Sequence, residues 1–342
     1  MSIQGVLFMG YFSSGVQKLV VLKALAVATL VLFILSPCYS QQLDIVAACF
    51  TIRDMVEDGN GTIWVGTFGA GLWEKNSEGT RLFSASVDKQ PFPMISNLLL
   101  DGNKLWIATA GGGCVCFNTK TRSFEPVKQL KGFSKLHGLF KTSGNELLIG
   151  SVGSGTAILN SKAQNPAWEN IASRTLQHLS WVNHIDEWEG KIWLGTATGL
   201  YHTNARDLKK NWAPASAGLG EGVNHLFPTK DLLYISTTTR GVFAMKPGKQ
   251  PFPIADTFGE IYFVTRFRDK LIGGGKYGLW EIKNKKGYQI SSFPDFAAKS
   301  FLVTKNNTLF IGTMDGRIIS TEDLKEFNHV LNLQQLVSEG AK

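Results

Sequence analysis

Seven copies of one short pattern predict an all-β fold, a seven-bladed β-propeller of four-stranded antiparallel blades. The clearest copy is Gly61–Trp73, in which the apolar run Ile63–Val65 is followed by Gly66 and a glycine turn. The position of Gly66 recurs at 66, 108, 150, 195, 236, 273 and 312, with an average period of about 41 residues. All-β units of this length are typical of propeller blades rather than of helical repeats.

Each unit is expected to begin with an inner strand beside the axis of the ring. The expected inner strands are Ile52–Glu57, Ile95–Leu100, Leu136–Lys141, Val182–Glu187, Val223–Phe227, Ile261–Thr265 and Lys299–Thr304. The turn signal Asp58–Gly61 ends the first of them. The apolar run forms the second strand, in which Trp64 is expected to pack blades together rather than form a site. The segment after the glycine turn, such as Cys114–Asn118, forms the third strand.

The fourth strand of each unit has a weaker pattern. We expect it at Thr80–Ala85, Ser123–Val127, Trp168–Ile171, Trp212–Ala215, Phe252–Ile254, Tyr288–Ser292 and Phe327–Leu331. A blade of this kind is apolar on both faces, so it must stack against two neighbours in a closed ring. We expect Leu43–Phe50 to add a strand to the last blade, and the polar tail Gln334–Lys342 to fray. No Pro- or Ser-rich linker interrupts the repeats, so residues 41–342 are expected to form one domain.

Residues 1–40 have the layout of a secretory signal peptide. Two lysines precede the uncharged apolar run Ala24–Leu35, and small residues at Cys38 and Ser40 predict cleavage before Gln41. The run is short for a membrane span. The protein is therefore expected to be exported, to the periplasm or out of the cell. An uncleaved anchor and a lipoprotein attached through Cys38 are the alternatives.

The charge balance is mildly basic. The full chain has a formal charge of +8, and removing residues 1–40, which hold two lysines and no acid, leaves +6. The basic groups are scattered except at Lys209-Lys210 and Lys283–Lys286, which we interpret as solvated turns. We therefore expect no nucleic acid partner.

Three cysteines follow the predicted cleavage site, at positions 49, 114 and 116. An odd number cannot form a complete set of disulfides, and Cys114 and Cys116 would share one face of a strand. We interpret them as buried free thiols, with a disulfide from Cys49 to one of them as the alternative. No further Cys or His is spaced as a metal ligand, so no metal or other cofactor is expected.

The segment Val56–Thr67, VEDGNGTIWVGT, resembles the two-component regulator propeller repeat, whose pattern is D-x-x-G-x-L-W-x-G-T-x-x-G-L. Units one, two and four match this pattern well and the other four are worn, and the resemblance extends over nearly all of Ile52–Leu331. That family occurs in the extracytoplasmic sensors of bacterial hybrid histidine kinases. The resemblance implies a bacterial, ligand-binding sensor propeller, here without a kinase module of its own.

A second resemblance is to the Asp-box repeats of sialidase-like propellers, S-x-D-x-G-x-T-W. Ser161–Trp168 and Ser320–Phe327 keep the spacing of this pattern, and His202–Trp212 is a longer version of it. The aspartate is absent or replaced in these segments. In that family the boxes are structural turns between third and fourth strands. No position here matches the sialidase arginine triad or its Tyr/Glu nucleophile pair.

Ligands of propellers commonly meet the face where the inner strands begin. Alignment of the seven inner strands predicts a ring there, made of Asp54, Asn97, Gly138, His184, His225, Phe263 and Ser300. The preceding positions are Arg53, Ser96, His137, Asn183, Asn224, Tyr262 and Lys299, and the loops add Phe68, Thr198, Arg240, Lys276, Tyr277 and Asp315. From these we select, as candidate ligand-binding residues, Arg53, Asp54, Asn97, His137, Asn183, His184, Asn224, His225, Tyr262, Arg240 and Tyr277.

Two interpretations of this ring are open. It could be a polar pocket with aromatic walls, suited to a sugar or another polar small molecule. Alternatively, its residues could hydrogen-bond the neighbouring backbone around a water-filled channel. A metal held by His184 and His225 is a further alternative, although no carboxylate or third histidine is evidently placed with them.

We predict an exported propeller that binds a glycan, another polar small molecule or a partner protein, which would be a membrane-bound signalling protein or a surface protein. A monomer is expected. We assign no catalytic residue, because no nucleophile–base spacing occurs and a glycosidase pair would need Asp54 and Asp315 from distant blades. A carbohydrate-active hydrolase or lyase and a protein-interaction scaffold are the alternatives, since the fold alone does not determine an activity.

Overall fold

The computed structural model of the chain describes residues 50–83, 94–159, 168–172, 179, 181–208, 212–215, 219–256 and 259–339. Residues from Ala47 onward form one compact unit. The predicted signal peptide, Cys38 and Cys49 lie outside the described residues, as does Leu43–Phe50 apart from Phe50 itself. No helix among the described residues is long and apolar enough to cross a lipid bilayer.

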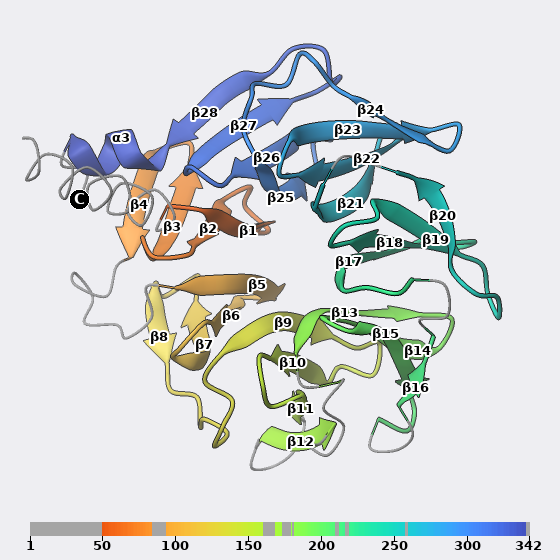
Figure 1. Cartoon of the computed structure of the whole chain (residues 1–342). Helices are drawn as coiled ribbons and strands as arrows, with labels where there is room; N and C mark the ends of the chain where they lie inside the picture. Colours follow the sequence, from red (N-terminus) through yellow and green to blue (C-terminus); the bar gives the residue numbers. More distant parts are fainter. Residues whose placement is uncertain are drawn as a thin grey trace, which may run out of the picture. The chain divides into compact units, whose positions relative to one another are not determined.

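The described chain forms seven four-stranded antiparallel sheets, which confirms the predicted seven-bladed β-propeller. Figure 1 shows the sheets around a common centre, with the first strand of each blade innermost. Blades one to four are β1 (Ile52–Glu57), β2 (Ile63–Thr67), β3 (Leu72–Asn76), β4 (Gly79–Phe83); β5 (Ile95–Asp101), β6 (Lys104–Thr109), β7 (Gly113–Asn118), β8 (Ser123–Glu125); β9 (Leu136–Lys141), β10 (Leu147–Ser151), β11 (Thr156–Leu159), β12 (Trp168–Ala172); and β13 (Val182–Trp188), β14 (Lys191–Thr196), β15 (Gly199–Asn204), β16 (Ala213–Pro214). Blades five to seven are β17 (Val223–Pro228), β18 (Leu233–Thr237), β19 (Val242–Met245), β20 (Phe252–Ala255); β21 (Ile261–Phe267), β22 (Lys270–Gly275), β23 (Gly278–Lys283), β24 (Lys286–Gln289); and β25 (Ala298–Val303), β26 (Leu309–Thr313), β27 (Arg317–Thr321), β28 (Asn328–Asn332).

The strand positions follow the repeat closely, with two corrections in blade six. Its fourth strand, β24, spans Lys286–Gln289 rather than the predicted Tyr288–Ser292. Its repeat position is 274 rather than 273, because Phe263 pairs with Gly274 as Asp54 pairs with Gly66. Three consecutive glycines in β22 leave no side chain from which the sequence could set this register.

The C-terminal tail does not fray where the sequence analysis expected it to. Leu333–Ser338 form helix α3, whose first turn is capped by the side chain of Asn332. Leu333 is fully buried in one hydrophobic cluster with Trp73 of blade one and Ile318 of blade seven, and Leu336 packs against the same cluster. Two leucines three residues apart on one helical face were the signal in an otherwise polar segment.

The blades pack on each other through glycines of their second strands. A Cβ atom on Gly66 would lie 2.5 Å from Cγ2 of Ile95, the first residue of the next inner strand. A Cβ atom on Gly312 would lie 2.5 Å from Cγ2 of Ile52, where blade seven meets blade one. The repeat glycine therefore leaves the space that the next blade fills with its first aliphatic side chain.

The threonine that follows this glycine closes the turn to the third strand. Thr67 Oγ1 donates a hydrogen bond to the carbonyl of Gly71 (2.8 Å) and accepts one from the amide of Ala70 (2.9 Å). Thr109 and Thr237 make the same pair of bonds in blades two and five. The Gly-Thr pair of the repeat is therefore structural at both positions.

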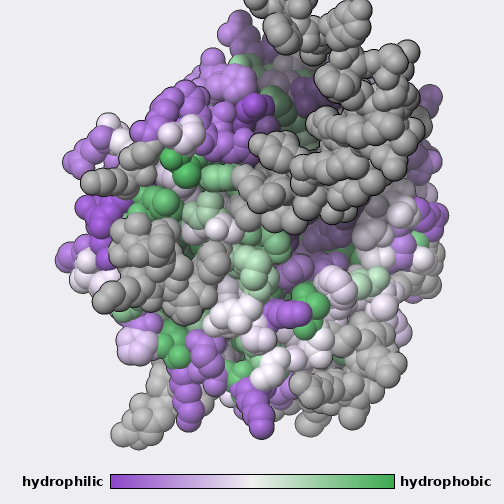
Figure 2. Space-filling view, turned by 60° about the vertical axis from the view of Figure 1, so that its left-hand side comes forward, coloured by the Kyte–Doolittle hydropathy of each residue, from purple (hydrophilic) through white to green (hydrophobic). Residues whose placement is uncertain are grey.

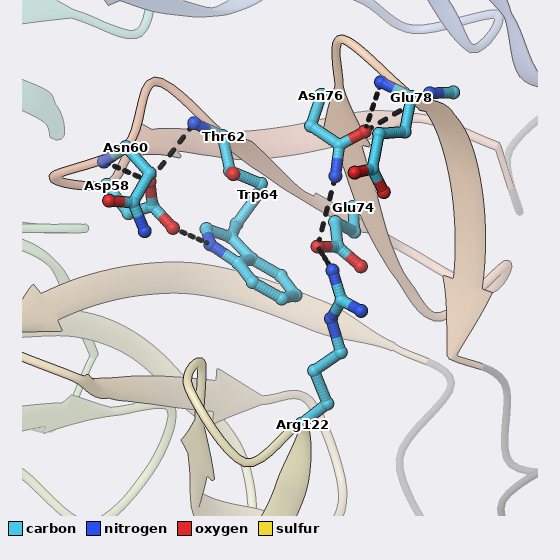
Figure 3. A network of polar contacts seen from close by, with 9 residues as sticks. Asp58, Asn60, Thr62, Trp64, Glu74, Asn76, Glu78 and Arg122 are labelled. Atoms are coloured by element: carbon cyan, nitrogen blue, oxygen red, sulfur yellow. Dashed lines mark hydrogen bonds and ion pairs between the residues drawn. The ribbon is translucent and has the colours of Figure 1, made fainter.

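The aspartate and tryptophan of the first repeat are bonded to each other. Asp58 accepts hydrogen bonds from the amides of Asn60 (2.8 Å) and Thr62 (3.0 Å) and from Nε1 of Trp64 (3.3 Å), as Figure 3 shows. The Trp64 ring lies in a cluster with Phe117 of blade two, 5.3 Å between ring centroids. This contact between blades confirms the predicted packing role of Trp64.

A second contact in Figure 3 joins the outer parts of the first two blades. Glu74 of β3 is buried, and its carboxylate pairs with the guanidinium of Arg122, between β7 and β8, at 2.8 Å.

In blade two, Cys114 and Cys116 are buried in one hydrophobic cluster and carry no disulfide, as expected for free thiols.

Substitution of Gly66 by Ala tests the packing of the blades. The added Cβ overlaps Ile95, so we expect Gly66→Ala to lower the free energy of unfolding by about 1–3 kcal/mol, measured by urea denaturation. Gly59→Ala is the control, because a Cβ atom there would have no neighbour within 4 Å. In the double variant with Ile95→Ala the loss should be smaller than the sum of the two single losses. Strict additivity would contradict the proposed contact.

Candidate functional site

The inner strands surround a half-open cavity of about 880 Å³ to which all seven contribute side chains. This volume lies within the range of roughly 300–1,000 Å³ typical of ligand pockets. Nine of the eleven candidate residues line it, namely Arg53, Asp54, Asn97, His137, Asn183, His184, Asn224, His225 and Tyr262.

The other two candidates, Arg240 and Tyr277, do not line this cavity. The Arg240 guanidinium donates a hydrogen bond to the carbonyl of Leu219 (2.7 Å) and lies 5.1 Å from the ring centre of Phe243. Tyr277 is exposed in the turn between β22 and β23. The structure therefore brings together the inner-strand candidates but not these two loop residues.

A β-bulge lies at the same place in every inner strand. In blade one the register shifts between Ile52 and Asp54, so Arg53 is the extra residue, and the six other blades repeat this shift. A bulge leaves its extra residue unpaired in the ladder and re-aims the side chain. We call these seven the bulge residues: Arg53, Ser96, His137, Asn183, Asn224, Tyr262 and Lys299.

Three bulge residues bind the next blade. In each, the side chain donates a hydrogen bond to the backbone carbonyl of the first residue in the neighbouring inner strand. The bonds are Ser96 Oγ to Leu136 O (2.5 Å), Asn183 Nδ2 to Val223 O (2.9 Å) and Asn224 Nδ2 to Ile261 O (3.0 Å). These side chains are therefore part of the seam between blades.

The residue after the bulge makes a second kind of seam bond. It accepts a hydrogen bond from a backbone amide of the next inner strand. The bonds run from Leu98 N to Asp54 Oδ2 (2.8 Å), from Leu139 N to Asn97 Oδ1 (2.8 Å) and from Leu226 N to His184 Nδ1 (3.4 Å). These contacts fit the alternative interpretation, in which ring residues satisfy neighbouring backbone groups. That they also bind a ligand stays a prediction.

Four bulge residues make neither kind of seam bond among the described residues. Arg53, His137, Tyr262 and Lys299, which we call the mouth cluster, all line the cavity. The Lys299 ammonium lies 3.5 Å from the ring centre of Tyr262, and the Arg53 guanidinium lies 5.5 Å from that of Phe68. The Tyr262 hydroxyl reaches the sulfur of Met314 (3.7 Å). Lys299 and Tyr262 therefore contact each other, and all four side chains line the cavity.

Burial and like charge shift the pKa values of the mouth cluster. Burial and, to a smaller extent, the nearby Arg53 cation lower the pKa of Lys299 to about 7, while Glu260 opposes the shift. Burial also lowers the pKa of His137 to about 4, again with contributions from Arg53 and Lys299. Burial and the Glu260 carboxylate raise the pKa of Tyr262 to about 12. At neutral pH, His137 and Tyr262 are therefore uncharged.

Exposed aromatic and apolar side chains accompany the mouth cluster. Trp181, which precedes β13 and lines the cavity, is 46% exposed, and its ring meets His137 edge-on at 6.4 Å. Met314 and Tyr277 are also exposed, in turns between second and third strands. Figure 2 shows hydrophobic groups interspersed with hydrophilic groups on the described surface of one face.

The two ring histidines are in contact below the mouth cluster. The ring centroids of His184 and His225 lie 4.2 Å apart, and His225 also meets the ring of Phe301 edge-on. Burial lowers the pKa of His184 to about 4 and that of His225 well below its usual range. No group of three or more His, Cys, Asp or Glu residues in the described chain is placed to hold a metal.

The cavity lining also includes residues that the candidate set omitted, among them Lys299, Trp181 and Glu260. Lys299 was visible in the aligned strands as the bulge residue of blade seven. Trp181 and Glu260 both lie immediately before an inner strand, at a position that the alignment did not include. The sequence does show an aromatic residue, Trp181, and an acid, Glu260, at this equivalent position, and including the position in the alignment would have added both to the candidate set.

The two carboxylates proposed for a glycosidase pair are not placed together in the cavity. Asp54 lines it, whereas Asp315 does not and pairs with Arg317 at 2.9 Å. Asp54 is held by the amides of Met55 and Leu98 and by Asn97. Asp54 therefore takes part in the seam between blades one and two, and it does not form the pair with Asp315 that a glycosidase would need.

Replacement of His184 by Asn tests the buried histidine. Asn97 shows that an asparagine can make the same seam bond. The folded-state pKa of His184 is about 4 against an ordinary value of 6.5, so its contribution to stability is complete above 6.5 and is lost as pH falls toward 4. We expect urea denaturation of the wild type to show roughly 3 kcal/mol more loss between pH 7 and pH 4 than His184→Asn shows. Parallel pH curves would refute this assignment.

Comparison with protein families finds the two component regulator propeller repeat at residues 51–69. This match confirms the resemblance of the first unit and covers β1, the Asp58 turn and β2. No curated protein matches the chain.

Several solved structures share the fold. The chain is similar to the extracellular domain of BT3049 from B. thetaiotaomicron, described as a hybrid two component system (16% identity, TM-score 0.64, 79% of this chain and 39% of that one). It is similar to the extracellular domain of BT4673 from B. thetaiotaomicron, described as a one component system (15%, 0.63, 77% and 37%). PorZ, a surface component of the type-IX secretion system of Porphyromonas gingivalis, is also similar (14%, 0.60, 82% and 38%). At these identities the likeness shows the propeller fold, and the chain spans about two fifths of the length of each.

Proposed function

We propose that this chain is an exported, sensor-type β-propeller that binds a polar small molecule or glycan at the mouth of its central cavity. The observation that carries the proposal is the mouth cluster. Three of the seven bulge residues are used by the fold to join blades, whereas Arg53, His137, Tyr262 and Lys299 present polar groups to a cavity of about 880 Å³. Polar side chains in a concave site that do not bond the backbone of the next blade are available to a ligand.

The walls of the site suit a hydroxylated ligand. The exposed ring of Trp181 and the ring of Tyr262 offer apolar faces, on which sugar rings can stack, and the carboxylate of Glu260 offers acceptors for hydroxyl groups. The repeat matched at residues 51–69 and the fold shared with extracellular domains of signalling systems support a sensing role. A membrane-bound signalling protein or another surface protein would receive the signal.

A thermal-shift screen of the full-length protein against neutral and acidic mono- and oligosaccharides tests this function. We expect at least one stabilising ligand, because binding to the folded state alone raises the unfolding temperature. Trp181→Ala and Tyr262→Ala should each lower the affinity for that ligand by roughly tenfold or more, since each removes an aromatic side chain from the wall of the cavity.

Tyr288→Ala is the matched control, because Tyr288 is about as exposed as Trp181 but lies outside the cavity. If Tyr288→Ala lowers the affinity as much as the two site variants do, the ligand binds outside the cavity. Release of a cleaved product would instead favour a hydrolase or lyase. The absence of any stabilising saccharide would count against the proposed function and in favour of a scaffold.

A further inference from the structure

Two of the four mouth-cluster residues, Arg53 and Lys299, are cations for which the described residues provide no ion pair. Nε of Arg53 is buried and has no hydrogen-bond partner among the described residues. Both cations instead lie over aromatic rings, Phe68 and Tyr262.

The carboxylates near these cations are largely engaged elsewhere. Asp54 accepts hydrogen bonds from the amides of Met55 and Leu98 and from Asn97 Nδ2. Asp315 pairs with Arg317. Glu260, which acts on both cations electrostatically, also lies 3.3 Å from Asn224 Nδ2. The two half-buried cations therefore lie near two carboxylates, Asp54 and Glu260, and each of these carboxylates also accepts a hydrogen bond across a seam between blades.

We propose that Arg53 and Lys299 together bind an oxyanion group of the ligand, a carboxylate, sulfate or phosphate. This inference rests on the proposed function and narrows it to acidic ligands. The planar guanidinium of Arg53 can donate in parallel to two oxygens of such a group, and the Lys299 ammonium adds a second charge from the neighbouring blade. The negative charge of the ligand would offset the repulsion between these two half-buried cations.

The other bulge residues show that these cations are not required by the fold. Asn183 and Asn224 occupy the same position as Arg53, and both donate to the next blade. An asparagine in place of Arg53 would have the carbonyl of Ile95 available in the same way. Arg53→Asn and Lys299→Asn should therefore fold, and they remove the charge without removing the polar character of the site.

The pH range of binding follows from the groups that face Lys299. Its pKa of about 7 makes it lose its charge just above neutrality. The pKa values of His137, about 4, and Tyr262, about 12, keep both uncharged between pH 7 and 9. Arg53 stays charged over that range. Oxyanion affinity should therefore fall by roughly tenfold or more from pH 7 to pH 9, and Lys299→Asn should abolish most of this fall.

Calorimetric titration of the full-length protein at pH 7 with glucuronate, glucose 6-sulfate and glucose 6-phosphate, each compared with glucose, tests the proposal. We expect at least one acidic sugar to bind roughly tenfold or more tightly than glucose. Arg53→Asn and Lys299→Asn should each abolish that preference, whereas Lys249→Asn, an exposed lysine outside this cavity, should preserve it. The rank order of the three acids identifies whether a carboxylate, sulfate or phosphate is preferred.

Equal binding of glucose and all three acidic sugars would overturn the oxyanion site while leaving the saccharide-binding function intact. A preference for acidic sugars that survives in both Asn variants would overturn the oxyanion site as well, because other residues would then bind the acidic group. Absence of binding by all four sugars would also overturn it, and the broader saccharide screen then decides the proposed function separately. Urea denaturation of both variants verifies that lost binding does not reflect unfolding.

Discussion

The ring depends on one repeated contact, in which the first aliphatic residue of an inner strand enters the space beside a glycine of the preceding blade. Ile95 fills the space beside Gly66, and Ile52 fills that beside Gly312, so the last contact closes the ring with the same geometry as the first. Gly150 with Val182 and Gly195 with Val223 repeat this contact, and because a blade is apolar on both faces, it sets the spacing between inner strands at these four seams. The size of the central cavity is a consequence of that spacing.

Hydrogen bonds between inner strands then divide the polar residues at the centre into two classes. Polar side chains such as Asn183 and Asn97 complete the backbone of the next blade, and buried backbone groups require such partners. Polar side chains such as Arg53 and Lys299 make no such hydrogen bond to the backbone of the next blade in the described residues. The distinction is physical, because two like charges that are partly removed from water repel each other unless an opposite charge compensates them. It separates structural from candidate functional residues within one equivalent position.

Most of the architecture could be predicted from the sequence, because a strand pattern repeated seven times is strong evidence even where single copies are weak. The site could be predicted only in part. Alignment placed Arg53 and His184 in the same ring, but the sequence does not show that a bulge precedes His184 or that its Nδ1 accepts the amide of Leu226. It also does not show that Arg240 turns toward Leu219. These differences arise from register and side-chain direction, which periodicity does not determine.

The mouth cluster lies largely at the seam where the chain closes on itself. Arg53 comes from the first blade, Lys299 from the last and Tyr262 from the blade before it, and β1 lies beside β25 in the ring. Repulsion between the two cations acts across this seam, which the Ser300 hydroxyl joins to the carbonyl of Ile52 at 2.9 Å. A group that neutralises both cations would strengthen the one interface that covalent connectivity between successive blades does not support. Binding at the mouth would thereby be coupled to the stability of the whole ring, and a ligand could change how firmly the terminal blades are held.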